Sequence, residues 1–133
     1  MSQQKRIGVL TPSSNTALEP LTSAMVAGVP GVSAHFSRFR VTEISMGDKS
    51  QNQFDERTIL DAAQLLADAK VDVICWSGTS ASWLGFDRDR ALCARITELT
   101  GIPATTSVLA LNGLLAGQGA RTLGLVSRYG GDV

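Results

Sequence analysis

The spacing of hydrophobic residues changes from segment to segment along the chain and predicts alternating strands and helices. Residues 71–76 are mainly apolar, which is typical of a strand that is covered on both faces of a parallel sheet. Residues 55–69 instead repeat apolar side chains at steps of three and four, which predicts a helix with one buried face. Similar patterns predict strands over 6–10, 32–41, 104–108 and 122–127, and helices over 16–27, 87–100 and 109–116.

This alternation predicts an α/β fold, in which helices cover both faces of a parallel sheet. The predicted strand 32–41 departs from a simple pattern. Its apolar side chains begin at Val32, Ala34 and Phe36 and then change face at Phe39, which indicates a bulge. The mostly polar segment 43–52 is expected to form a loop.

Length, charge and hydropathy limit the class of protein. The 133 residues suffice for one α/β domain, and we expect it to span 1–133. Basic and acidic residues both number 12, and no basic run is longer than Lys5-Arg6, which argues against a nucleic-acid partner. Apolar stretches are shorter than the roughly 20 residues that cross a bilayer, and the first residues lack a secretion signal. We therefore expect a cytoplasmic protein without a membrane partner.

Two turns of small, polar residues follow predicted strands and carry the main functional signal. The first turn contains Pro12, Ser13, Ser14 and Asn15, and the second contains Gly78, Thr79 and Ser80. In an open parallel sheet, ligands bind outside the carboxyl ends of the strands. Backbone N–H groups and hydroxyls in such turns bind a carboxylate or a developing oxyanion. The two turns together predict an anion-binding site.

Other reactive side chains are sparse. His35 is the only histidine and lies in the predicted strand 32–41, which favours a structural or surface role. Cys75 and Cys93 lie in a predicted strand and a predicted helix, where a thiol packs as a small apolar group. The sequence has no nucleotide-binding glycine motif and no cysteine pair at metal-ligand spacing. We therefore expect no cofactor and no metal.

Several short strings, in this order and spacing, resemble one known family. Residues 6–16 are similar to maleate isomerases, while Gly78-Thr79-Ser80, residues 111–114 and residues 126–129 are similar to arylmalonate decarboxylase. The chain thus resembles the Asp/Glu racemase superfamily, in its maleate isomerase and arylmalonate decarboxylase group. The resemblance implies a flavodoxin-like N-terminal half of a two-half fold, with the active site between the halves.

The resemblance also implies a chemistry. The expected protein is a cofactor-independent enzyme that decarboxylates a small dicarboxylate through an enediolate. Thr79, Ser80 and Tyr129 would stabilise the oxyanion and the carboxylate, while the first turn and Gly78 would bind substrate. The alternatives are a maleate cis-trans isomerase-like enzyme and a catalytically inert anion-binding half. A flavodoxin-like binding module with an unrelated role is a third, because a fold alone does not fix function.

Two departures from the family pattern affect this expectation. Gly78 occupies the position of the first cysteine used by racemases and isomerases, and glycine can neither attack nor carry a proton. The second catalytic cysteine belongs to a half that this chain lacks. The sequence also ends directly after the predicted strand 122–127, where a helix is due. We therefore expect a truncated chain that associates with itself or with a missing second half.

Overall fold

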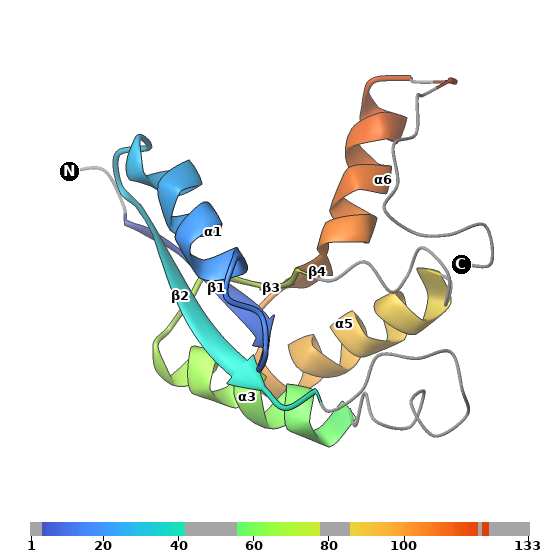
Figure 1. Ribbon diagram of the computed structural model, residues 1–133. Helices are drawn as coiled ribbons and strands as arrows, with labels where there is room; N and C mark the ends of the chain where they lie inside the picture. The colour runs from blue at the N-terminus through green and yellow to red at the C-terminus, as the bar shows by residue number, and fades with distance from the viewer. Residues whose placement is uncertain (1–3, 42–55, 78–85, 120, 123–133) are drawn as a thin grey trace.

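The computed structural model describes residues 4–41, 56–77, 86–119 and 121–122, which form an α/β fold (Figure 1). Four parallel strands form one sheet in the order β2-β1-β3-β4. The strands are β1 Lys5–Pro12, β2 Val32–Phe39, β3 Val73–Trp76 and β4 Ala104–Thr106. The helices are α1 Leu18–Ala27, α3 Glu56–Asp68, α5 Phe86–Thr100 and α6 Ser107–Gly117.

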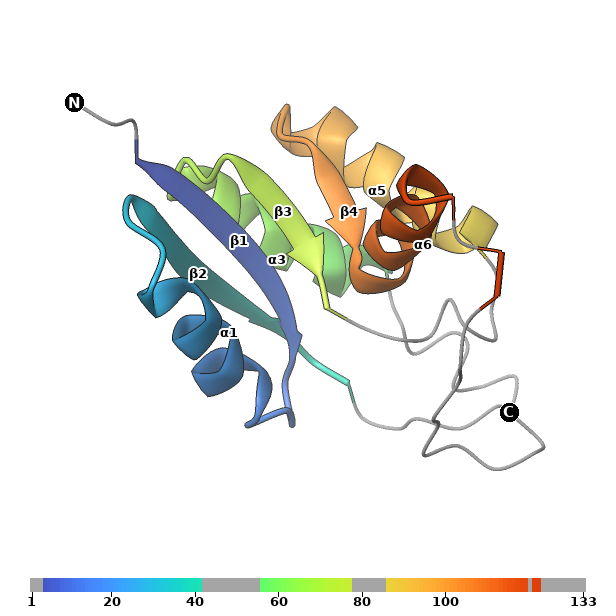
Figure 2. The ribbon, with the colours of Figure 1, turned by 90° about the horizontal axis from the view of Figure 1, so that it is seen from above.

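Helices lie on both sides of the sheet, as the alternating pattern predicts. Figure 1 shows α3 and α5 on one face and α1 and α6 on the other, and Figure 2 shows the strands side by side from above. The main core lies under α3 and α5, where Leu10, Ile74 and Ile59 are almost fully buried. Burial of such side chains is the main driving force for folding, at about 1.5–3 kcal/mol each. The predicted fold class is confirmed.

Strand β2 is regular, so the predicted bulge is wrong. Its register with β1 runs without interruption from Lys5 beside Val32 to Pro12 beside Phe39. The apolar side chains change face because both faces of β2 are covered, by α1 on one side and by α3 on the other. Phe39 belongs to the core on the α3 side. A strand with two covered faces does not need strict alternation.

The boundary between β4 and α6 lies earlier than the sequence pattern predicts. Thr106 has an extended backbone, and its Oγ1 accepts a hydrogen bond of 3.1 Å from the N–H of Leu109. This is the geometry of an N-cap residue, so the helix begins at Ser107. The predicted strand 104–108 is therefore two residues too long. The predicted loop 43–52 lies outside the described residues, as does nearly all of the predicted strand 122–127.

The helices within the described ranges are 10 to 15 residues long. None of these helices combines the length and the apolar character that a membrane span needs.

Candidate functional site

The carboxyl ends of β1 and β3 lie side by side at the centre of the sheet. From β1 the chain crosses through α1 to β2 on one side, and it later returns through α3 to β3 on the other side. Leu10 pairs with Trp76, so the chain leaves both strands at the same edge. Open α/β sheets bind ligands at such a switch point. The first turn therefore lies where this class of sheet holds its ligands.

Asn15 connects this turn to α1. Its Oδ1 accepts hydrogen bonds of 3.0 Å from the N–H of Ala17 and 2.8 Å from the N–H of Leu18. Its own N–H donates to the carbonyl of Pro12 at 3.0 Å. Because two backbone donors occupy Oδ1, the side-chain amide has one orientation, and Nδ2 is the group left for a ligand. Asn15 thus has the turn-forming role common to asparagine, and it also presents a fixed donor.

Ser13 connects the turn to the end of β2. Its N–H donates to the carbonyl of Phe39 at 2.8 Å, and its Oγ accepts a hydrogen bond of 3.0 Å from the N–H of Val41. Among the described residues the Ser13 hydroxyl proton has no acceptor, so it is available to a ligand. Ser14 is exposed, while Pro12 is half-buried at the end of β1. Of the four residues predicted in the first turn, Ser13 and Asn15 thus have their side chains fixed by backbone contacts.

Arg38 holds the turn from the neighbouring strand. Its Nη1 donates to the carbonyls of Pro12, Ser13 and Asn15 at 3.4, 3.1 and 2.8 Å. Its Nη2 lies 3.0 Å from Oε1 of Glu19 in α1. Sequence reasoning did not single out Arg38, because its contacts depend on the pairing of β1 with β2. A charged residue within the predicted strand 32–41 was a signal available in the sequence.

Two buried hydroxyls lie on β1 and β2 near this edge. Thr11 has no exposed surface and Ser37 is almost buried, and neither hydroxyl has a hydrogen-bond partner among the described residues. Because Thr11 pairs with Arg38, its side chain leaves the sheet on the face of Arg38. Thr11 is thus a buried polar group beside the first turn that sequence reasoning did not include among the site residues.

The other predicted site residues have no described structure. Gly78, Thr79, Ser80 and Tyr129 all lie outside the described residues. Their convergence on one pocket with Asn15 therefore remains a prediction. The structure describes Ser77, which follows β3 and is half-buried at the same edge as Pro12.

The two thiols are poor nucleophiles as the structure holds them. Burial raises the pKa of Cys75, which sits half-buried in β3. The pKa of Cys93 in α5 rises to about 11, through burial first and then through the charges of Asp89 and Cys75. The thiolate is the reactive form of cysteine, so neither group is activated at neutral pH. His35 contacts Ser33 at 2.9 Å on β2, away from the first turn.

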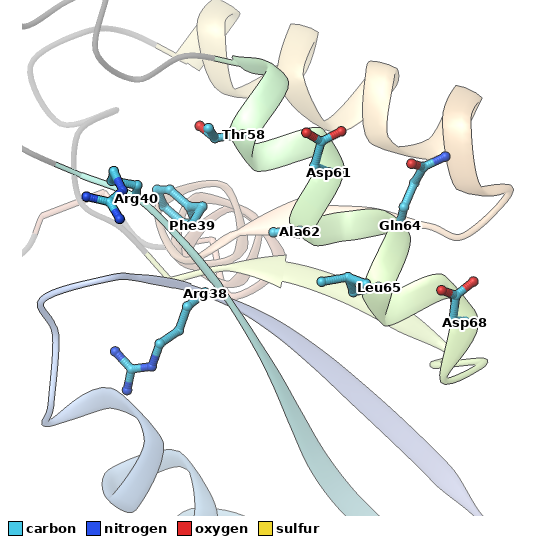
Figure 3. Close-up of a pocket in the computed structure, with 9 residues that line it drawn as sticks. All are labelled: Arg38, Phe39, Arg40, Thr58, Asp61, Ala62, Gln64, Leu65 and Asp68. Carbon is cyan, nitrogen blue, oxygen red and sulfur yellow. The ribbon is translucent and has the colours of Figure 1, made fainter.

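A cavity of about 420 Å³ lies between β2 and α3. Figure 3 shows that Thr58, Asp61 and Asp68 reach it from α3, while the side chain of Arg38 points away from α3, toward α1. The cavity contains no residue of the first turn. Within the described ranges, no three His, Cys, Asp or Glu side chains gather closely enough to hold a metal ion.

Comparison with protein families decides where the chain belongs. The family model of arylmalonate decarboxylase matches residues 7–133, which is nearly the whole chain. The chain belongs to the arylmalonate decarboxylase family. The resemblance to the Asp/Glu racemase-type group is thereby confirmed. No curated protein sequence gives a significant match.

Solved structures of the same group share the fold. A crystal structure of arylmalonate decarboxylase has a TM-score of 0.66 and 23% identity, and the match covers 86% of this chain and 46% of that one. The maleate isomerase Iso from Pseudomonas putida S16 has a TM-score of 0.69 and 23% identity, and the match covers 88% of this chain and 50% of that one. This chain therefore spans about half the length of these proteins. The partial coverage fits a match to one half of the family fold.

Proposed function

We propose that this chain supplies the carboxylate-binding half of a cofactor-independent enzyme that acts on small dicarboxylates by decarboxylase-type chemistry. The observation that carries the proposal is the first turn, which lies at the switch point of an arylmalonate decarboxylase fold and presents an amide donor in one orientation. Nδ2 of Asn15 is a pure donor, and a substrate carboxylate is a pure acceptor. The second turn and Tyr129 would complete the set of donors.

Decarboxylation needs hydrogen-bond donors at the carboxyl group that remains on the substrate. When the bond between the substrate carbon and the leaving carboxylate breaks, carbon dioxide departs and the electron pair stays on the substrate. The charge passes to the remaining carboxyl group as an enediolate. Thr79, Ser80 and Tyr129 would stabilise that charge by hydrogen bonds, which are worth most in a site shielded from water. A proton donor must then protonate the carbon, and in this proposal it comes from the second half of the enzyme.

Decarboxylase-type chemistry is preferred to isomerase-type chemistry for a reason in the sequence. Gly78 stands where the isomerase pattern has its nucleophilic cysteine, and glycine cannot form a covalent adduct. Cys75, three residues earlier, is a half-buried thiol whose pKa is raised by burial. The alternative of an inert anion-binding half keeps the same binding site and predicts no turnover with any partner.

The test is a calorimetric titration of the chain with phenylmalonate, maleate and, as the monocarboxylate control, phenylacetate. We expect both dicarboxylates to bind more tightly than phenylacetate, with phenylmalonate the tightest. In a full-length context, Thr79→Ala or Tyr129→Phe would each remove a proposed hydrogen bond to a charged ligand, worth about 1.5–3 kcal/mol. Each should weaken phenylmalonate binding by about tenfold to a hundredfold. Equal affinity for all three acids would contradict the proposal.

Turnover assays on the same samples test the reaction type. The chain alone should release no carbon dioxide from phenylmalonate and should form no fumarate from maleate, because neither described thiol is activated. Isomerisation of maleate that is abolished by Cys75→Ala would contradict the decarboxylase proposal and make Cys75 a catalytic residue.

A further inference from the structure

Arg38 joins three parts of the chain that are distant in sequence. Its guanidinium reaches across from β2 to three carbonyls of the turn that follows β1, and also to Glu19 in the first turn of α1. Figure 3 shows this side chain leaving β2 toward α1, although Arg38 and Arg40 are both among the residues that line the cavity beside α3. Arg40 follows the end of β2, and the contacts with the turn and with Glu19 are those of Arg38.

The contacts of Arg38 act on backbone groups that shape the turn. The carbonyls of Pro12, Ser13 and Asn15 converge on one nitrogen, and the guanidinium charge offsets the repulsion between their dipoles. Glu19 fixes the other nitrogen of the fork. The guanidinium is planar and rigid, so it sets the spacing of groups that a lysine ammonium would hold only as a point charge.

The same turn determines the orientation of the Asn15 amide. The carbonyl of Asn15 accepts the shortest of the three Arg38 bonds to the turn, and the side chain of Asn15 accepts from Ala17 and Leu18. The Arg38–Glu19 ion pair is partly exposed, and such a pair by itself contributes little to stability. The bonds to the three carbonyls, rather than the ion pair, are therefore what Arg38 contributes to the turn.

We propose that Arg38 is a positioning residue for dicarboxylate recognition, which holds the Pro12–Asn15 turn so that the Asn15 amide faces the substrate. The inference rests on the proposed function for the identity of the ligand. The contacts of Arg38 with the turn are present without a ligand. The effect of Arg38 on the turn can therefore be measured in the unliganded chain.

The first measurement is amide hydrogen exchange of the unliganded chain by NMR. Arg38→Met should speed exchange at the N–H groups of Ser13 and Leu18 by at least tenfold, because their acceptors lie in or beside the turn. The N–H of Ile74, which donates to Pro103 elsewhere in the sheet, should keep its rate. Arg40→Met is the matched control, since it removes the same charge from the same segment and should leave all three rates unchanged.

The second measurement is phenylmalonate affinity by NMR titration. Arg38→Met should weaken binding at least tenfold, and Arg40→Met by less than threefold. Arg38→Lys keeps the charge but loses the fork, and it should still weaken binding at least fivefold. In an Asn15→Ala background, Arg38→Met should cost less than a further threefold, because Arg38 acts through Asn15.

The outcomes separate the two proposals. Full affinity in Arg38→Lys, or equal losses for Arg38→Met with and without Asn15, would overturn the positioning role. If no variant and not even the unmodified chain binds phenylmalonate, the proposed function fails, and hydrogen exchange alone decides the role of Arg38. If Arg38→Met does not fold, Arg38→Lys supplies the same exchange test. Unchanged exchange at Ser13 and Leu18 would refute the inference in either case.

Discussion

The hydroxyl of Thr106 donates a buried hydrogen bond of 2.6 Å to Oδ2 of Asp89, and so ties the end of β4 to α5. The same oxygen accepts the N–H of Leu109 and caps α6. Thr106→Val removes both bonds and leaves a buried Asp89 without its partner. We expect a loss of about 2–4 kcal/mol in the free energy of unfolding, measured by urea denaturation.

The neighbouring threonine provides the control for that experiment. Thr105 is half-buried and makes one long contact of 3.4 Å with the carbonyl of Thr106. Thr105→Val should change the free energy of unfolding by less than about 0.5 kcal/mol. Equal effects at the two positions would show that the bond to Asp89 contributes nothing to stability.

Gly8 is required by a close approach of β1 to the chain near the end of α3. A Cβ at this position would lie 2.9 Å from Cγ2 of Val71 and 3.1 Å from Cδ1 of Leu66, both of which are buried. Gly8→Ala should therefore destabilise the protein by about 1–3 kcal/mol through overpacking. Thermal denaturation followed by circular dichroism measures the change.

A second glycine should respond to the same substitution in the opposite direction. Gly113 lies inside α6, and a Cβ there meets no atom of the described residues within 4 Å. Gly113→Ala should stabilise the protein by about 0.5–1 kcal/mol, because alanine loses less entropy in a helix. A decrease in stability for Gly113→Ala would mean that residue 113 needs a backbone conformation other than the helical one.

Cys93 should make stability depend on alkaline pH. Its pKa in the folded protein rises from the ordinary 9.0 to about 11, so the folded state keeps a proton that the unfolded chain releases. The contribution of Cys93 is fully present below pH 9 and is lost as the pH rises to about 11. Urea denaturation from pH 8 to pH 11 should show this decline, with a smaller slope in Cys93→Ala. Identical slopes in the two proteins would exclude Cys93 as the source.

Exposed apolar side chains on α1 and α6 should promote self-association. Met25 is 76% exposed and Leu114 is 64% exposed, and the two helices lie on the same side of the sheet (Figure 1). Exposed apolar surface of this kind favours pairing with another protein surface. Sedimentation at high protein concentration should show an associating chain, and Leu111→Gln with Leu114→Gln should shift it toward the monomer. A compact monomer at every concentration would contradict this prediction.

The sequence by itself determined the order and type of the elements. The apolar spacing of 55–69 and the apolar run near Val73 report which sides of each segment are buried, and this local property needs no knowledge of partners. The turn after β1 was predicted in the same way, because proline, serine and asparagine that directly follow a buried strand usually form a turn. Pattern alone placed the end of β4 too late, since the capping bond of Thr106 outweighs the strand propensity of the next residues.

Only the tertiary structure decided how the first turn is held. Arg38 lies 23 residues from Asn15 in sequence, and the two meet because β2 pairs with β1 in one particular register. The same register places Phe39 in the core and makes β2 regular where the pattern suggested a bulge. Hydropathy reports whether a side chain is buried, but not which distant backbone carbonyl it reaches. That choice depends on strand pairing and on the path of the crossover through α1, which no single segment encodes.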